Sequence, residues 1–118
     1  AQQNPSAVSI ETYGLPQYAL EQLRSVFSQW PEIETVLLYG SRATGTYRAN
    51  SDIDLTLCAG QLDFNAQLKI ENQIDDLLLP WGVDLSLLHL IDNAALRDNI
   101  ERDGVVFYQR NSQTNSIN

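Results

Sequence analysis

The chain has 118 residues, of which 43% are hydrophobic, and this length supports one hydrophobic core but not two ordinary domains. Its 15 acidic and 7 basic residues give a formal charge of −8. This acidity argues against binding along a DNA or RNA backbone, which rests on many contacts from Lys and Arg to phosphate. A small nucleotide remains compatible, because it needs only a local positive charge.

Cysteine usage and hydropathy exclude two further classes of protein. Cys58 is the single cysteine and cannot form an internal disulfide, and no Cys/His cluster has the spacing of a structural zinc site. The longest apolar runs are far shorter than a membrane span, and the N-terminus has no basic region followed by an apolar one. We therefore expect a soluble, cytoplasmic protein without structural zinc or membrane contact.

The first third of the chain predicts an arm, a helix and a strand. Residues 1–14 are polar and show no sustained periodicity, which predicts a flexible N-terminal arm. Apolar residues then recur at steps of three and four between Pro16 and Pro31, which is typical of an amphipathic helix. Residues 34–39 (ETVLLY) are rich in β-formers and predict the first strand.

The remaining elements continue this alternation. Strands are predicted at residues 52–57, 83–88 and 105–108, and helices at residues 64–79 and 93–102. Asp63 and Asp92 are the expected N-caps of these two helices. The inner side of the first of them is expected to carry Phe64, Leu68, Ile74, Leu77 and Leu78. Residues 15–109 thus predict one α/β (α+β) domain, a small mixed sheet of about four strands flanked by about three helices, with a disordered tail at 110–118.

Two aspartates stand near the end of the stretch 40–57, GSRATGTYRANSDIDLTL. Residues 52–57 alternate polar and apolar, so Asp52 and Asp54 are expected to project from one face of a half-buried strand. Their carboxylates would then lie roughly 6 to 7 Å apart along the strand. Like charges at this separation repel unless a cation lies between them, and hard oxygen ligands suit Mg²⁺ or Mn²⁺. The pair therefore predicts a divalent metal site.

A third aspartate belongs to the alternating run at residues 83–88, where Asp84 lies on the polar face. A lone Asp at the start of a strand is usually a cap or a solvated residue. Here a single helix connects this strand to the strand of the aspartate pair, and strands that are neighbours in sequence commonly pair in space. Such pairing would place Asp84 beside Asp52 and Asp54, so that three carboxylates line one pocket.

Phosphate-binding groups are expected between the first strand and the aspartate pair. Gly40 allows a tight turn and a close approach of backbone to a ligand, and the Ser41 hydroxyl follows it directly. Arg42 and Arg48 concentrate two of the 7 basic residues in this loop. The alternative interpretation is an ordinary turn with two solvated arginines. Position favours the phosphate interpretation, because the Gly-Ser pair follows a strand and leads back to the aspartates.

Two other polar side chains receive no assigned role. His89 is the only histidine, and we interpret it as an edge residue because no acidic or nucleophilic partner lies near it in the sequence. Tyr47 is either an exposed loop tyrosine or a residue that stacks on a nucleotide base.

As a set, these residues resemble the nucleotidyltransferase superfamily typified by DNA polymerase β, and within it the minimal MNT-type proteins. The shared pattern consists of Gly40-Ser41, the stretch 51–55 (SDIDL) and Asp84 on a later strand. The likeness covers nearly the whole chain from the first helix to the last strand, and it implies the nucleotidyltransferase core fold. A D-x-D pair alone is common, whereas the complete set is hard to obtain by chance.

The resemblance implies a role for each residue. Asp52, Asp54 and Asp84 would be the catalytic residues and would hold two Mg²⁺ or Mn²⁺ ions, with ATP as the nucleotide donor. The nucleotide-binding residues would be Gly40, Ser41, Arg42, Arg48 and Ser51. A nucleoside monophosphate would pass to an acceptor hydroxyl with loss of pyrophosphate. Because MNT-type proteins resemble the antitoxins of pairs with HEPN-family RNase toxins, the implied acceptor is a tyrosine of a HEPN partner.

Other functions are compatible with parts of this pattern. A binding module would neutralise a partner by complex formation alone. Nucleotidyl transfer to a small molecule such as an aminoglycoside is less favoured, because the pattern includes no drug-binding domain. A phosphate receiver also uses clustered aspartates but would need a lysine late in the chain, whereas Lys69, the sole lysine, lies in a predicted helix.

Overall fold

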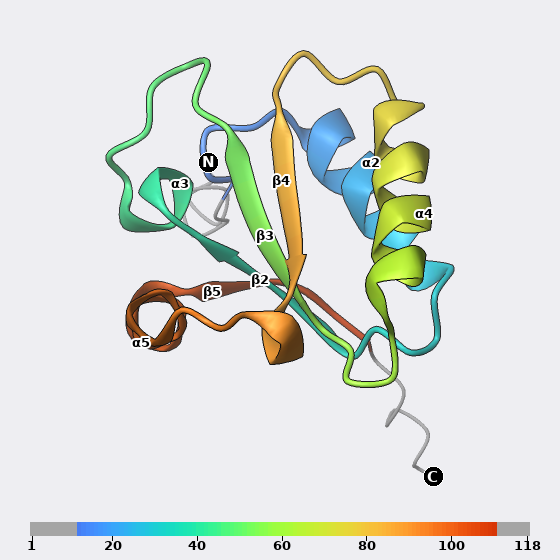
Figure 1. The fold of residues 1–118 in the computed structure, drawn as a ribbon. Coiled ribbons are helices and arrows are strands. Elements are labelled where there is room, and N and C mark those ends of the chain that lie inside the picture. The colour runs from blue at the N-terminus through green and yellow to red at the C-terminus, as the bar shows by residue number, and fades with distance from the viewer. Residues whose placement is uncertain (1–11, 111–118) are drawn as a thin grey trace, which may run out of the picture.

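Four strands form one mixed β-sheet in a computed structural model that describes residues 12–110 (Figure 1). They are β2 (Thr35–Tyr39), β3 (Ile53–Cys58), β4 (Val83–Leu87) and β5 (Val105–Gln109). The order across the sheet is β4-β3-β2-β5. Strands β3 and β4 run parallel, whereas β2 is antiparallel to both β3 and β5. The sequence-based prediction of a small mixed sheet of four strands is confirmed.

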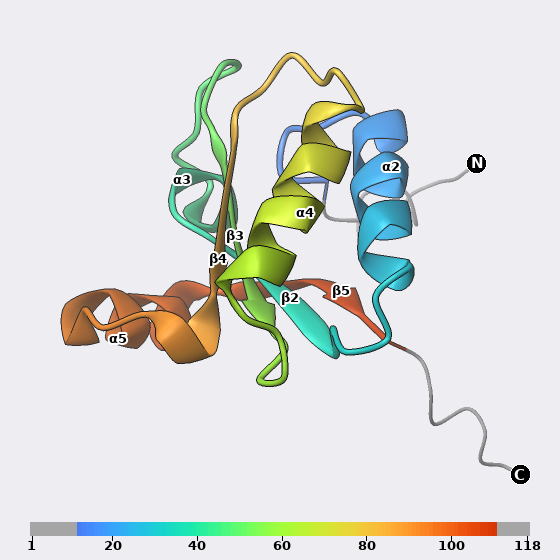
Figure 2. The ribbon, with the colours of Figure 1, turned by 45° about the vertical axis from the view of Figure 1, so that its right-hand side comes forward.

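Helices cover the two faces of this sheet unequally. The helices are α2 (Gln17–Ser28), α3 (Ser41–Thr44), α4 (Phe64–Asp75) and α5 (Ala94–Asp103), with a 3₁₀ turn η1 at Leu88–Leu90. Figure 2 shows α2 and α4 side by side on one side of the sheet and α5 on the other. The loops that precede β3 and β4 lie at the same end of the sheet, the upper end in Figure 1. That end therefore carries the starts of both parallel strands.

The hydrophobic core lies between the sheet and the pair α2 and α4. Strand β3 contributes Ile53, Leu55 and Leu57, all fully buried, while the residues between them face the opposite side. The helices contribute Leu20, Leu23, Phe27, Ile70 and Ile74, and the other strands contribute Val36, Leu38, Leu85, Leu87 and Phe107. Alternation along β3 thus fixes which face of the sheet is open to polar chemistry.

Helix α4 differs from its predicted inner side. Ile74 is buried as expected, but Phe64, Leu68 and Leu78 are 57%, 41% and 86% exposed. Leu68 and Ile74 are six residues apart, which is about 120° around a helix of 3.6 residues per turn, so they cannot share a narrow face. Ile70 takes the inward position instead. Leu78 follows the end of the helix and has a positive φ of 57°, which turns it out of the helical stripe.

The N-caps of α4 and α5 are an aspartate and an asparagine side chain, respectively. The prediction of Asp63 as N-cap is confirmed, since its carboxylate accepts a hydrogen bond from the Ala66 N–H. The prediction of Asp92 is wrong by one residue, because the Asn93 side chain accepts the bond from the Leu96 N–H. Asp and Asn are equally good caps, so the adjacent pair gave no basis for choosing between them.

The two ends of the chain fall largely outside the described residues. Residues 1–11 and 111–118 belong to the expected arm and tail and are not described. The residues next to them have defined contacts: the Tyr13 carbonyl accepts a hydrogen bond from Arg42, and the Arg110 side chain donates to the Ile33 carbonyl. Between residues 12 and 110, no helix has the length and apolar character that crossing a membrane requires.

The corrected cap of α5 gives a test of the fold. Asn93→Ala should lower the free energy of unfolding by about 1 kcal/mol, because the Leu96 N–H loses its acceptor. Asp92→Ala removes a neighbouring side chain that caps nothing and should change it by less than about 0.5 kcal/mol. Urea unfolding of both variants measures the difference. A larger loss for Asp92→Ala would restore the sequence-based assignment.

Candidate active site

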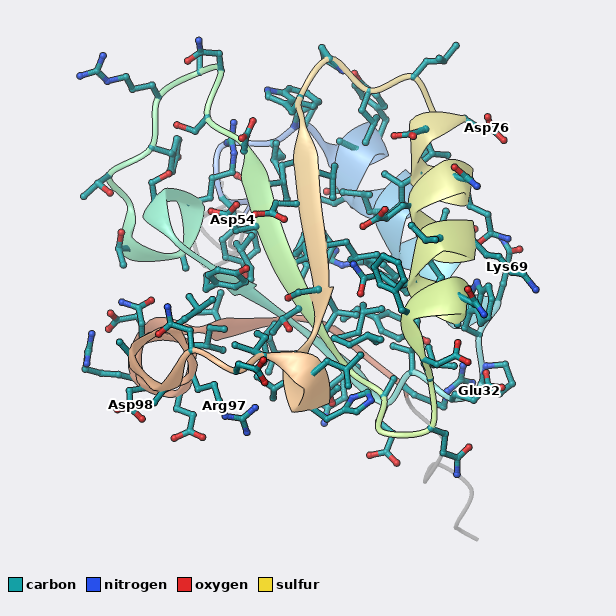
Figure 3. All side chains as sticks on the ribbon, in the orientation of Figure 1. Glu32, Asp54, Lys69, Asp76, Arg97 and Asp98 are labelled. Atoms are coloured by element: carbon teal, nitrogen blue, oxygen red, sulfur yellow. The ribbon has the colours of Figure 1, made fainter. Side chains whose placement is uncertain are left out.

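Asp54 and Asp84 lie directly opposite each other on neighbouring parallel strands. The register of β3 with β4 pairs Ile53 with Val83 and Asp54 with Asp84. Because strands in a sheet are about 4.8 Å apart and paired residues face the same side, both carboxylates extend from the same face. This face is opposite to the one that packs on α2 and α4. Figure 3 shows Asp54 beside β3 and near α3.

Asp52 lies just before β3 at the same end of the sheet. Its side chain is exposed and rests against the start of the neighbouring strand, where a Cβ added to Gly82 would meet its Oδ1 at 2.8 Å. The Ile53 N–H donates to the Gly82 carbonyl at 2.8 Å, which joins the two strand starts. The absence of a side chain at Gly82 therefore provides the space that the Asp52 carboxylate occupies.

Gly40 provides the corresponding space for Asp54. Strand β2 ends opposite Asp54, with Tyr39 paired to it, and Gly40 follows with a positive φ of 78°. A Cβ added to Gly40 would collide with the Asp54 Oδ2. Glycine is therefore required at this position for two reasons, the left-handed backbone and the contact with the carboxylate. The chain then enters α3 at Ser41.

Electrostatics link the three carboxylates. The pKa of Asp54 is raised above its usual value of 3.8, first by burial, then by the negative charge of Asp84 and then by that of Asp52. Two like charges within interaction range disfavour ionisation of a third group. The structure pairs Asp54 with Asp84 and places Asp52 at the same end of the sheet, and a cation at this position would relieve the repulsion between their charges.

Convergence of the carboxylates is not complete. Within residues 12–110, no three side chains of His, Cys, Asp or Glu are close enough to form a ready-made metal site. The donor set is nevertheless the one that magnesium and manganese prefer, namely carboxylate oxygens without sulfur or imidazole. Its chemistry therefore fits a hard divalent cation, and the assignment of Asp52, Asp54 and Asp84 as metal ligands stays a prediction.

Three further side chains, those of Tyr39, Thr56 and Ser86, are linked by hydrogen bonds on the face that carries Asp54 and Asp84, and sequence reasoning assigned them no role. Tyr39 is 9% exposed and lies at the end of β2, opposite Asp54. The pKa of its phenol is raised, chiefly by burial. A hydrogen bond with Ser86 lowers this pKa, and the charges of Asp84 and Asp54 raise it. The Ser86 hydroxyl donates to the Thr56 Oγ1 at 2.8 Å. The only available signal was the strand period, because the partners belong to three different strands.

The two arginines of the loop differ in their surroundings. Arg42 is 2% exposed, and its guanidinium donates only to backbone carbonyls, those of Tyr13, Ala49 and Ser51. This burial contradicts the expectation that Arg42 is available to phosphate. Arg48 is exposed and keeps that expectation. The Ser51 hydroxyl accepts a hydrogen bond from the Arg48 N–H at 2.8 Å, so it also stabilises the loop.

His89 lies far from the aspartates along the sheet. Its Nε2 is 3.0 Å from the Leu62 carbonyl oxygen. It lines a cavity of about 270 Å³ together with Cys58 and Arg97, at the opposite end of β3 from Asp54. Burial and the charge of Glu34 raise the pKa of the Cys58 thiol, which keeps this cysteine protonated. This cavity contains none of the residues that the sequence assigned to the site.

Comparison with known families identifies the fold. Residues 21–113 match the family described as polymerase beta, nucleotidyltransferase. The chain belongs to this family. No curated protein matches the sequence of this chain significantly.

Solved structures share the nucleotidyltransferase fold. A proposed nucleotidyltransferase from Sulfolobus solfataricus is 25% identical with a TM-score of 0.55, over 92% of this chain and 91% of that chain. A chain of a toxin–antitoxin complex with AMP-PNP is 24% identical with a TM-score of 0.62, over 84% and 77%. A chain of the complex between the tri-AMPylated HEPN toxin of Shewanella oneidensis and an MNT antitoxin is 19% identical with a TM-score of 0.60, over 83% and 76%.

These comparisons confirm the recognised family. The chain resembles in fold the chains of HEPN–MNT toxin–antitoxin complexes, as the sequence pattern implied. At identities below 25% this likeness establishes the fold alone.

The raised pKa of Asp54 predicts a pH-dependent effect on stability. The stabilising contribution of protonated Asp54 is fully present below its usual value of 3.8 and is lost as the pH rises through the higher folded-state pKa. Asp54→Asn should therefore raise the free energy of unfolding at pH 7, and this gain should disappear below pH 3.8. Urea unfolding across this range measures it. Asp98→Asn, an exposed change on α5 (Figure 3), controls for net charge, and equal gains from both variants would contradict the local cause.

The contact between Gly82 and Asp52 gives a second test. Gly82→Ala should displace the Asp52 carboxylate and weaken Mn²⁺ binding by about 10-fold, the loss typical when a group that orients a ligand is disturbed. Gly60→Ala is the matched control, because a Cβ there meets nothing within 4 Å. Calorimetric titration of Mn²⁺ compares the two variants. Identical affinities would show that Asp52 is not a ligand held at this position.

Proposed function

We propose that this chain is a metal-dependent nucleotidyltransferase that moves AMP from ATP to a tyrosine hydroxyl of a partner HEPN toxin and thereby acts as an antitoxin in the cytoplasm. The observation that carries the proposal is the register that places Asp54 opposite Asp84, next to the Gly40-Ser41 turn. Family membership supports the reaction class. The AMP-PNP and the tri-AMPylated HEPN toxin named for structures of similar fold support the donor and the acceptor.

The side chains of this site have complementary roles in the proposed reaction. Asp52, Asp54 and Asp84 would hold the divalent ions, magnesium or manganese, for which their oxygens and mutual repulsion are suited. When bound, these ions supply positive charge that stabilises the attacking and leaving oxygens. Gly40 keeps the backbone close to Asp54, and the hydroxyl of the adjacent Ser41, the first residue of α3, would donate to a phosphate oxygen.

The reaction itself is a substitution at the α-phosphorus. The acceptor oxygen forms a bond to this phosphorus, the bond to the bridging oxygen of the β-phosphate breaks, and pyrophosphate leaves. The acceptor proton passes to a carboxylate of the site or to water. Arg48 is exposed in the loop before Asp52 and is available to the departing phosphates, whereas Arg42 is not, since its donors are directed to backbone carbonyls.

Loss of one metal-holding carboxylate should abolish transfer. Asp52→Asn should lower the rate at which the co-encoded HEPN protein is labelled from ATP and Mg²⁺ by at least about 100-fold, the order of loss when one charge-stabilising group is removed. Asp98→Asn, an equal change of charge on α5, should retain the wild-type rate. Labelled ATP and mass spectrometry of the HEPN tyrosines measure both. Labelling that survives in Asp52→Asn would sink the mechanism.

The alternative of a pure binding module makes the opposite prediction for Asp54. An antitoxin that acts only by complex formation would still neutralise the toxin with Asp54→Asn, whereas an enzyme would not. Co-expression of toxin and variant, with complex formation checked by gel filtration, separates the two. Transfer to an aminoglycoside is tested in the same assay by replacing the HEPN protein with the drug.

A further inference from the structure

Arg42 is the largest polar side chain in the interior of the described chain. It is 2% exposed, although an arginine is almost never fully buried unless its charge is paired. Its only hydrogen-bond acceptors are carbonyl oxygens, and the one ion pair within residues 12–110 is between Arg102 and Asp103. Burial of a charge is costly without such bonds. This cost indicates that the guanidinium has a structural role in joining segments of the chain.

The carbonyls that Arg42 binds belong to two separate segments. Its Nη1 donates to the Tyr13 carbonyl at 2.8 Å, in the turn that precedes α2. Its Nη2 and Nε donate to the Ser51 carbonyl at 2.9 and 3.1 Å, and Nη2 also donates to the Ala49 carbonyl at 3.3 Å. These four bonds use four of the five N–H groups of a guanidinium. Arg42 therefore ties the N-terminal turn to the loop before Asp52.

Packing reinforces the same connection. The Tyr47 ring lies 5.1 Å from the Arg42 guanidinium carbon, within the range of a cation–π contact. Gly14 has a positive φ of 75° and lies so close to the Tyr47 ring that a Cβ would collide with it. Tyr47 thus contacts both the N-terminal turn and Arg42. These contacts favour a structural role for Tyr47 over stacking on a nucleotide base.

A third segment, the one that leads into β4, also contacts the loop. The Trp81 Nε1 donates to the Ala49 carbonyl at 3.0 Å, and Trp81 precedes Gly82, which contacts Asp52. The loop is also closed on itself by the Ser51 N–H, which donates to the Arg48 carbonyl at 3.0 Å. Asp52 follows Ser51 directly. The backbone before Asp52 therefore accepts hydrogen bonds from both Arg42 and Trp81.

We propose that Arg42 is a positioning residue, which fixes the loop 45–52 and so the location of Asp52, and that it does not contact the nucleotide. This inference rests on the proposed nucleotidyl transfer. It makes residues 12–14 part of the support of the site, because the Tyr13 carbonyl is one of the acceptors. The positive charge of Arg42, which has no carboxylate partner among the described residues, also lies against the loop that carries Arg48.

Kinetics distinguish positioning from phosphate binding. Arg42→Met and Arg42→Lys should each lower kcat for labelling of the HEPN protein by about 100-fold, the loss expected from a displacement of about 1 Å. The KM for ATP should change by less than about 3-fold, since no substrate contact is removed. Arg42→Lys should not restore kcat, because lysine lacks the planar guanidinium fork that donates to two segments at once. A raised KM with unchanged kcat, or rescue by lysine, would overturn the proposal.

Arg110→Met is the matched control. The Arg110 side chain also donates only to carbonyls, those of Ser28, Trp30 and Ile33, and lies at the other end of the sheet. The Arg110→Met variant should have a lower free energy of unfolding but the wild-type kcat. Trp81→Phe is the milder second variant, because it keeps an aromatic ring and removes only the donor to Ala49. It should lower kcat in the same direction as Arg42→Met, and an unchanged kcat would count against the loop being held from both sides.

Hydrogen exchange separates failure of this inference from failure of the proposed function. Exchange of the Arg48 and Ser51 amides, which are bonded within the loop, should speed up at least about 10-fold in Arg42→Met but not in Arg110→Met. This measurement needs neither ATP nor a toxin. Absence of labelling by the wild-type protein would refute the function alone. Unchanged exchange in Arg42→Met would refute the positioning role alone.

Discussion

Parallel pairing of β3 with β4 is the constraint on which the site depends. In this register Asp54 faces Asp84, and the same strands bury Leu55 and Leu85 on the other face. A slip of one residue would exchange the faces, so the aspartates would enter the core and the leucines would meet water. The burial of the leucines therefore holds the carboxylates in place. Stability and the arrangement of the site come from one alternating pattern.

The same arrangement has an electrostatic cost. Three carboxylates gather on one edge, and the pKa of Asp54 rises because burial and its two neighbours disfavour its charge. Within residues 12–110 no ion pair joins these carboxylates to a basic side chain, and the donors of Arg42 point to carbonyls. In the part of the chain that the structure describes, the side chains do not converge into a ready-made metal site, although the backbone holds Asp54 and Asp84 on one face. The divalent ion proposed for this site would offset the electrostatic cost.

Sequence reasoning found the parts of this site that depend on period and failed on those that depend on tertiary contacts. The alternation of 52–57 and 83–88 was enough to place Asp54 and Asp84 on one face, since a strand has a period of two. Nothing local indicated that Arg42 is buried, because its acceptors are carbonyls, which every residue has. Tyr39 was read as a strand residue only, since its partners lie on β3 and β4. The choice between Asp92 and Asn93 failed for a related reason, as both side chains satisfy the same rule.

Burial of Arg42 reduces the positive charge that the loop can offer to a ligand. Of its two arginines, one is structural and one is exposed, so the net positive charge offered to a polyphosphate is smaller than the sequence suggested. In a chain of charge −8, the proposed binding of ATP would then depend chiefly on cations brought with the nucleotide. If Arg42 and Trp81 hold the loop backbone as proposed, side chains rather than main chain would rearrange around those cations. A stiff backbone with adjustable carboxylates lowers the cost of organising the site, because few main-chain degrees of freedom are lost on binding.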